Sequence, residues 1–283
     1  MNKTIAVLIT CHNRKSKTVA CIKRLFELLL PNNLENLDIY LVDDGSSDGT
    51  SNAVKEIFPN VHIIQGDGSL FWNQGMRLAW ETAVNVKEYD FYLWVNDDVI
   101  LEEDALIELM GCYAEAKIIE NHELIVTGAF RNSEFSNKFS YGGRTESEIV
   151  IPNGELLQCK YINGNTVLIS KKIYSSLGNL SPDYTHAMGD FDYGLRAIQA
   201  GFKNFTTKKY IGICQTNEEP QWSNPKVPLK KRIELFRSPL GLNFKEYMMF
   251  RKKFWKTRWI LFGIKAYLKV LLPSFYKVLK NKA

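Results

Sequence analysis

The sequence predicts an α/β protein with a mostly parallel central sheet and flanking helices. Strand-length apolar runs alternate with polar loops and with segments of helical periodicity, three times within residues 5–86. The first run, residues 5–10, is continuous instead of alternating, which is typical of a parallel strand buried on both faces. Ligands bind such sheets at the carboxyl ends of the strands, so we expect the polar loops there to line one cleft.

The remaining elements follow from apolar spacing and from the turn residues that end it. Pro31, Pro59 and Gly201 mark the ends of three predicted helices. The predicted helices are residues 18–30, 51–58, 73–86, one from Glu103 and one from about Phe191 to Ala200. The predicted strands are residues 5–10, 37–42, 61–65, 91–95 and 124–127, with a polar region at 131–155 and a further apolar run at 167–169.

The composition is that of a globular protein with an ample core, at 45% hydrophobic and 24% charged residues. No N-terminal run resembles a signal peptide, and no stretch approaches the roughly 18 apolar residues of a spanning helix. The five cysteines include no Cys-x-x-Cys pair. We therefore expect reduced thiols in a cytoplasmic protein and no zinc site.

The segment Asn96-Asp97-Asp98 directly follows the predicted strand 91–95. Adjacent carboxylates at the end of a buried strand repel each other and lose hydration, so they are tolerated mainly where a cation neutralises them. Hard divalent cations take one or two carboxylates together with phosphate oxygens of a substrate. The segment therefore favours a metal site; the alternative is a solvated turn that caps the helix from Glu103.

Charge divides the chain into an acidic body and a basic C-terminal extension. Residues 226–283 contain 16 Lys and Arg against two acids, whereas residues 1–225 contain 20 bases against 29 acids. Basic residues beside Trp255, Trp259 and Phe262 suit a helix that lies on an anionic membrane. The acidic body argues against nucleic acid as a partner. A solvated helical extension or a homodimer arm is the alternative.

Four polar motifs follow one another along the chain. They are Ile-Thr-Cys-His-Asn-Arg at 9–14, Val-Asp-Asp-Gly-Ser-Ser-Asp-Gly-Thr at 42–50, Asn-Asp-Asp at 96–98 and Gly-Asp-Phe-Asp-Tyr-Gly-Leu-Arg-Ala at 189–197. In this order and spacing they resemble glycosyltransferase family 2, whose GT-A fold is Rossmann-like, over roughly residues 4–217. The last motif and the segment at 66–73 resemble, in particular, the bacterial rhamnosyltransferase-like subgroup that builds surface polysaccharides.

This resemblance implies inverting, metal-dependent transfer of a single sugar from a nucleotide-sugar, either dTDP-rhamnose or a UDP-sugar. The acceptor would be a hydroxyl of a lipid-linked glycan at the inner face of the cell membrane, and the cofactor Mg²⁺ or Mn²⁺. The chain has no Gln-x-x-Arg-Trp motif, which processive synthases of the family carry. Two other interpretations stay open: a catalytically silent nucleotide-sugar-binding scaffold, and a nucleotidyltransferase. The latter expects a glycine-rich phosphate loop, and residues 11–14 contain no glycine.

The resemblance also implies roles for individual residues. Asp98 is similar to the main metal ligand, Asp44 to the aspartate that binds the pyrimidine, and Asp190 to the general base. The residues expected to bind the nucleotide-sugar are Thr10, Asn13, Asp44, Asp67, Trp72, Asn73, Asn96 and Asp97.

Several of these residues have a structural alternative. Asp43 and Asp44 suit a turn before a helix, and Asp190 suits the N-cap of a helix starting near Phe191. The pair Phe71-Trp72 suits a hydrophobic core.

Two departures from the family pattern, and one further candidate residue, bear on the site. The usual Glu-Asp pair is Gly189-Asp190, and Asp192 would point to the opposite side of the helix. His186 is a candidate for acceptor or metal contact, with a structural role as the alternative. Relatives supply a late histidine to the metal, where this chain has Cys214 and Asn217, so the third ligand stays open.

Overall fold

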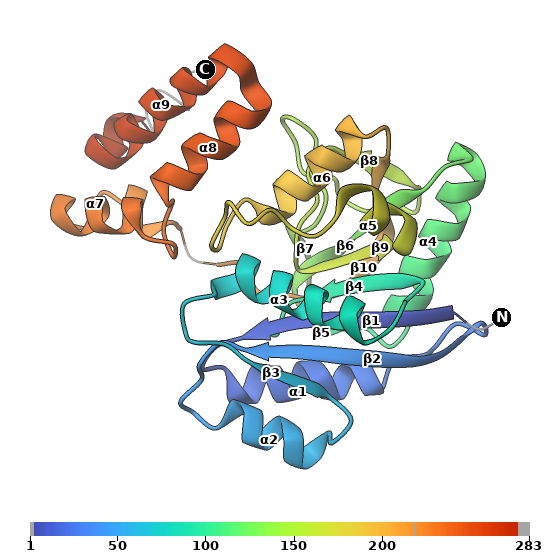
Figure 1. Ribbon diagram of the computed structural model, residues 1–283. Coiled ribbons are helices and arrows are strands. Elements are labelled where there is room, and N and C mark those ends of the chain that lie inside the picture. The colour runs from blue at the N-terminus through green and yellow to red at the C-terminus, as the bar shows by residue number, and fades with distance from the viewer. Residues whose placement is uncertain (1–2, 218, 277–283) are drawn as a thin grey trace. The chain divides into compact units, whose positions relative to one another are not determined.

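The computed structural model describes residues 3–217 and 219–276, and these form two compact units (Figure 1). The first unit comprises the chain up to Pro182 together with Gly189–Thr216. The second comprises Asp183–Met188 together with the chain from Asn217 onward. The domain boundary predicted at residue 225 stays a prediction.

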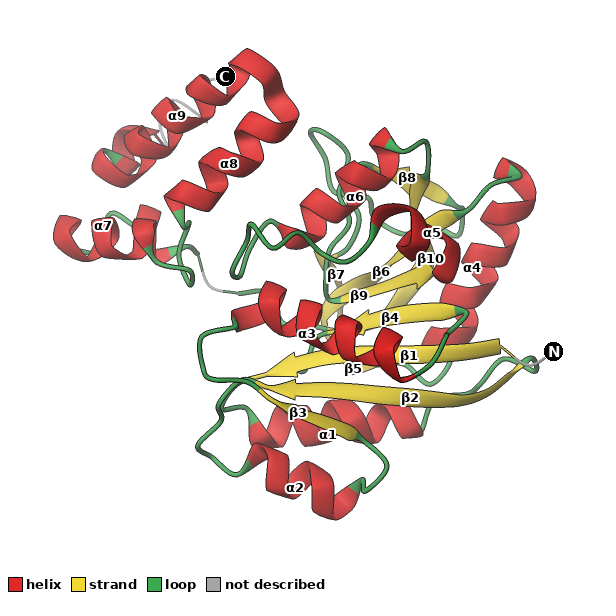
Figure 2. Cartoon of the chain, in the orientation of Figure 1, coloured by secondary structure: helices red, strands yellow, loops and turns green. Residues whose placement is uncertain are grey.

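The first unit is a mixed sheet covered by helices on both faces (Figure 2). Its main strands are β1 (Lys3–Cys11), β2 (Leu34–Asp43), β3 (His62–Gln65), β4 (Phe91–Val95), β5 (Ile100–Leu101), β6 (Leu124–Ser133), β9 (Thr166–Ser170) and β10 (Lys203–Ile213). They lie in the order β3-β2-β1-β4-β9-β6-β10-β5, with β7 (Ser136–Tyr141) paired to β6 and β8 (Leu157–Cys159) to β10.

The main strands of this sheet run parallel to one another, and β9 is the main exception. Strands β3, β2, β1 and β4 pair in parallel, and so do β6 and β10. Strand β9 runs antiparallel to both β4 and β6, so that β6 and β10 again point the same way as β4. The predicted α/β class and the mostly parallel sheet are confirmed.

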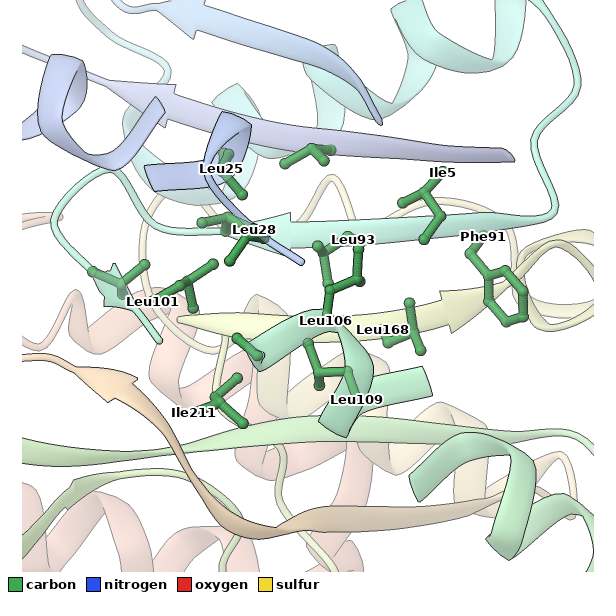
Figure 3. Close-up of a cluster of buried hydrophobic side chains, with 14 of the residues drawn as sticks. Ile5, Leu25, Leu28, Phe91, Leu93, Leu101, Leu106, Leu109, Leu168 and Ile211 are labelled. Atoms are coloured by element: carbon green, nitrogen blue, oxygen red, sulfur yellow. The ribbon is translucent and has the colours of Figure 1, made fainter. Parts of the chain in front are cut away.

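Helices from both halves of the chain cover the two faces. They are α1 (Lys15–Phe26), α2 (Thr50–Ile57), α3 (Phe71–Val86), α4 (Ala105–Glu120), α5 (Lys171–Leu177) and α6 (Gly189–Gln199). On β1, Ile5, Val7 and Ile9 join a buried cluster with α1, α2 and α4, part of which Figure 3 shows. Ala6 and Leu8 point to the opposite face and pack with α3, α5 and α6. Two apolar faces explain why this run has no polar alternation.

Most predicted elements lie within a few residues of their expected positions, but β10 was not predicted. Its sequence is polar, yet Asn204, Thr206 and Thr207 are all buried. The Asn204 amide donates to the carbonyl of Gly194 at 3.1 Å, and the Thr207 hydroxyl accepts the N–H of Ala129 at 3.0 Å. Tertiary hydrogen bonds let this strand bury Asn204 and Thr207, and apolar periodicity does not report such partners.

The second unit is helical, as predicted for the extension. Its elements are a 3₁₀ turn (Gln221–Ser223), α7 (Leu229–Arg237), α8 (Phe244–Trp255), a 3₁₀ turn (Lys256–Arg258) and α9 (Trp259–Leu271). Phe236, Ala266 and Val270 form its buried centre. The segment Asp183–Met188 joins it through Thr185, whose hydroxyl donates to Glu246 at 2.6 Å.

The last basic residues of the predicted membrane-binding tail, Lys277, Lys280 and Lys282, lie outside the described residues. Within the described chain, no helix is long and apolar enough to pass through a bilayer.

Candidate active site

The candidate site is built at the edge of the sheet where the parallel strands end. Cys11, Asp43 and Gln65 are register partners across β1, β2 and β3, and Leu8 pairs with Trp94 near the end of β4. The loops predicted to gather there therefore start side by side, and hydrogen bonds link them.

Asp44 ties the loop after β2 to the loop after β3. Its carboxylate accepts the backbone N–H of Gly68 and of Phe71, each at 2.8 Å. A side chain at Gly66 would place its Cβ 2.7 Å from Oδ1 of Asp44, so only glycine fits there. Asp43 is also buried and accepts the N–H of Ser46 at 3.0 Å. Both aspartates thus organise turns, and the pyrimidine contact of Asp44 stays a prediction.

Asn13 ties the loop after β1 to the same region. It has a left-handed backbone, with φ of 51°. Its N–H donates to the Ser46 hydroxyl and its Oδ1 accepts the N–H of Ser47, both at 2.8 Å. Thr10 instead packs against α3, since a Cβ at Gly75 would lie 2.2 Å from its Oγ1. Asp67 is exposed and accepts hydrogen bonds from Ser69.

The two carboxylates after β4 share one guanidinium group. Nη1 of Arg14 lies 3.0 Å from Oδ1 of Asp97 and 3.0 Å from Oδ2 of Asp98. The hydroxyl of Thr18 donates to Oδ2 of Asp97 at 3.2 Å. Burial raises the pKa of Asp97 to about 6, although Arg14 opposes that rise.

Arg14 is the site residue that sequence reasoning missed. The interpretation of Asn96-Asp97-Asp98 required a neutralising cation, but the chain supplies one from 83 and 84 residues away. Burial tends to lower the pKa of Arg14, yet the two carboxylates raise it above its usual value, so the guanidinium stays charged. The signal in the sequence was the single arginine that ends the polar loop after β1.

Trp72 connects the metal-site motif to Asp190. Its indole N–H donates to Oδ1 of Asn96 at 2.7 Å, and its ring lies so close to Gly164 that a Cβ there would be 2.4 Å away. The N–H of Gly164 donates to Oδ2 of Asp190 at 2.9 Å. Asn96 also donates from Nδ2 to Oδ1 of Asn165 at 2.6 Å. The loop before β9 thus lies between the two acidic positions.

Asp190 lies inside α6 and not before it. The helix begins at Gly189, so the predicted N-cap position is wrong, because the first turn extends two residues further than the pattern indicated. Oδ1 still accepts the N–H of Phe191 at 2.8 Å. Burial raises the pKa of Asp190 to about 6, while the amides of Gly164 and Phe191 lower it.

The other acid on α6 is directed elsewhere. Asp192 is fully buried and accepts the Nε–H of Arg196 at 2.7 Å, and the choice of Asp190 as the acid that faces the site stays a prediction. Asn73, in the first turn of α3, is buried and donates to the carbonyl of Ser181 at 2.9 Å.

Cys214, which was considered as a third metal ligand, lies in the first unit, and the other two candidates for metal contact lie in the second unit. Cys214 is buried, and its pKa is raised to about 12 by burial and by the charge of Asp98, although Lys17 and Arg14 oppose the rise. Its sulfur accepts the amide of Asn165 at 3.2 Å. Asn217 and His186 belong to the second unit. The roles considered for these three residues stay predictions.

The donor atoms fit a hard cation that shares its ligands with a substrate. Among the described residues, no three His, Cys, Asp or Glu side chains gather as a metal-holding group. Asp98, 22% exposed, lies beside Asp97, which is 5% exposed. One or two carboxylates completed by phosphate oxygens is the usual arrangement for Mg²⁺ in nucleotide-dependent enzymes. These residues therefore suit a divalent cation that binds with a diphosphate.

Solved structures share this fold at low sequence identity. Mannosyltransferase PcManGT from Pyrobaculum calidifontis, in complex with GDP-Man and Mn²⁺, matches with a TM-score of 0.58 at 14% identity, covering 99% of this chain and 84% of that chain. S. aureus TarS residues 1–349, in complex with UDP-GlcNAc, matches with a TM-score of 0.56 at 15% identity, covering 97% and 73%. GalNAc-T7 with UDP, GalNAc and Mn²⁺ matches with a TM-score of 0.55 at 12% identity, covering 83% and 50%.

No curated protein matches the sequence. The structural likeness establishes the GT-A fold. The family model "Glycosyl transferase family 2" matches residues 6–175, which is more than half of the chain. The chain therefore belongs to glycosyl transferase family 2 and is a glycosyltransferase.

Proposed function

We propose that the enzyme transfers one sugar, with inversion, from a nucleotide-sugar to a hydroxyl of a lipid-linked glycan during surface-polysaccharide synthesis. The observation that carries this proposal is the link from Asp97 and Asp98 through Asn96, Trp72 and Gly164 to Asp190. It supports a leaving-group site and a proton acceptor on one sheet edge. The donor class is dTDP-rhamnose or a UDP-sugar, and the complexes of PcManGT and TarS with other nucleotide-sugars support such a donor.

At the leaving-group side, Asp98 would hold Mg²⁺ or Mn²⁺, which when bound supplies charge neutralisation for the departing diphosphate. Asp97 is held in place by Arg14 and Thr18 and so supports the position of Asp98. Asn96 would contact the ribose or orient Trp72, whose indole N–H it accepts.

The nucleotide would lie over the loops after β1, β2 and β3. Asp44 and Asn13 hold these loops together, and Thr10 fixes the start of α3. We propose these residues, together with Asp67 and Asn73, as the nucleotide-sugar pocket.

On the acceptor side, Asp190 is the proposed general base. Its pKa of about 6 leaves the carboxylate ionised at neutral pH and still basic enough to take a hydroxyl proton. The two backbone amides that it accepts fix the orientation of the carboxylate.

We also propose that the second unit holds the enzyme on the inner face of an anionic membrane. On α9, Gly263, Ala266 and Val270 are buried. A neighbouring face, about 100° around the helix from these residues, is apolar yet exposed, with residues spaced four, three and four apart, as on one side of a helix. These residues are Ile260, Ile264, Tyr267 and Leu271.

Charge supports a lipid surface as the occupant of this face. Lys265 is exposed beside the apolar stripe, and the 58 residues from 226 onward contain 16 bases against two acids. An apolar hollow of about 390 Å³ opens along α8 and α9, lined by residues that include Phe244 and Met248. Apolar insertion combined with basic flanks is the chemistry of helices that lie in an anionic interface.

A donor screen tests the proposed function. Thermal unfolding of the purified enzyme is followed with UDP-, GDP- and dTDP-sugars, with and without Mn²⁺. We expect one nucleotide-sugar to raise Tm, with a larger rise when Mn²⁺ is present, because a ligand of the native state stabilises it. Asp98→Asn should lose the Mn²⁺-dependent part, and the exposed Glu103→Gln should keep it. Failure of every nucleotide-sugar to shift Tm would contradict the proposal.

A further inference from the structure

Arg14 contacts both carboxylates of the metal-site motif, and these two carboxylates differ in their other hydrogen bonds. It contacts both at 3.0 Å, but Asp97 also accepts the Thr18 hydroxyl. Within the part of the chain that the structure describes, Arg14 is the hydrogen-bond partner of the Asp98 carboxylate. Asp97 is therefore fixed from two sides, while Asp98 is held by one half-exposed side chain.

The Arg14 side chain can move without disturbing the backbone around it. Its carbonyl accepts the N–H of Thr18 at 2.9 Å and the Thr18 hydroxyl at 3.1 Å, so the start of α1 is fixed by main-chain atoms. The side chain is 49% exposed at the open edge of the site. A guanidinium released from Asp98 would thus remain beside it, with donors suited to phosphate oxygens.

We propose that Arg14 is a built-in counter-cation. It pairs with the carboxylate of Asp98 until the diphosphate of the donor binds. This inference rests on the proposed role of Asp98 as a metal ligand. A divalent cation alone must displace the guanidinium from Asp98 and then lie beside its positive charge. A diphosphate removes that conflict, because it accepts hydrogen bonds from Arg14 and supplies further oxygens to the cation. Metal and donor therefore bind cooperatively, and the metal alone binds weakly.

The pattern of ligands supports the same conclusion. The absence of a three-residue metal-holding group among the described side chains leaves a lone cation with few protein ligands. Arg14 lowers its affinity further by like-charge repulsion. Removal of Arg14 should consequently have opposite effects on the two ligands: tighter binding of free metal and weaker use of the donor.

Mn²⁺ binding to the full-length protein, measured by calorimetry in the absence of nucleotide, tests the inference. Arg14→Gln should lower the Kd for Mn²⁺ about tenfold, because one nearby positive charge is removed. Arg14→Lys keeps the charge and should bind Mn²⁺ as weakly as the original protein. Lys23→Gln removes a 69% exposed charge two turns further along α1 and should change Kd by less than about twofold, because exposed charges are screened.

A second measurement separates this role from a purely structural one. Turnover of the donor should fall in Arg14→Gln even though this variant binds Mn²⁺ more tightly. A distorted loop would instead lower both the turnover and the affinity for Mn²⁺. If Arg14→Gln binds Mn²⁺ no tighter than the original protein while Asp98→Asn loses binding, the counter-cation role is wrong and the metal site stands. If Asp98→Asn binds Mn²⁺ normally, both the metal site and this inference are wrong.

Discussion

Asp190 allows its chemical role to be separated from its structural one. Asn at this position keeps one acceptor oxygen, so Asp190→Asn loses one of the two backbone hydrogen bonds, at about 1 kcal/mol. It also removes a half-buried charge, which is stabilising at neutral pH because the folded protein raises the pKa of this carboxyl. We expect near-normal Tm with turnover down by about 10²-fold or more. Loss of folding at unchanged specific activity would mean that the residue acts structurally.

The same residue predicts how turnover depends on pH. A general base works when deprotonated, so activity should fall as pH drops through the Asp190 pKa of about 6. The residual activity of Asp190→Asn should lack this acidic limb. Initial rates between pH 5 and about 8, with donor binding measured at each pH as the control, decide the point. If both proteins lose activity at low pH in the same way, the loss is due to the titration of another group.

At the residue scale, the sequence located the acids but not their partners. Asp98 and Asp190 follow recognisable patterns, whereas Arg14 has neither strand nor helix periodicity and acts on residues more than 80 positions away. The sequence predicts that Trp72 contacts the sugar or packs in the hydrophobic core. Its hydrogen bond to Asn96 depends on how α3 crosses the end of β4, which local sequence does not encode.

At the element scale, α9 is the part whose function can be tested alone. Ile264→Glu places a charge on the exposed apolar face, at a side chain that is 53% exposed. Binding to anionic vesicles should weaken by about tenfold or more, because a buried isoleucine contributes about 2 kcal/mol. Ile118→Glu is the matched control, because Ile118 is an 82% exposed isoleucine on α4. Co-sedimentation measures both, and equal binding by the two variants would leave α9 without a membrane role.

Elements were predictable wherever one face of a helix or both faces of a strand are apolar. This holds for β1, β4 and α3, whose residues enter the two hydrophobic clusters directly. It fails for β10, which buries polar side chains, and for the two-residue β5, which pairs with β10. The sequence also did not predict that β9 lies between β4 and β6 and runs antiparallel to both, because the whole sheet decides which strands pair.

For the whole molecule, the proposed geometry fixes the stereochemical outcome. A base on one side of the donor and a diphosphate site on the other imply direct displacement at the anomeric carbon. The product should therefore have the anomeric configuration opposite to that of the donor, which NMR coupling constants of the purified product report. Retained configuration would rule out Asp190 as base in a single displacement.

The position of β9 has a consequence for the order of events during synthesis. Strands β4 and β6 leave the ribosome before the strand that lies between them, and Leu168 of β9 pairs with both Leu93 and Val126. Until then, each presents an unpaired apolar edge, the kind of surface that associates with other chains. A released fragment that ends at residue 160 should accordingly be cleaved by protease within β4 and β6, and fragments that extend past β10 should be protected. The lateral edges of β4 and β6 thus stay open until β9 (Thr166–Ser170) has been made, which exposes the newborn protein to aggregation over that part of its synthesis.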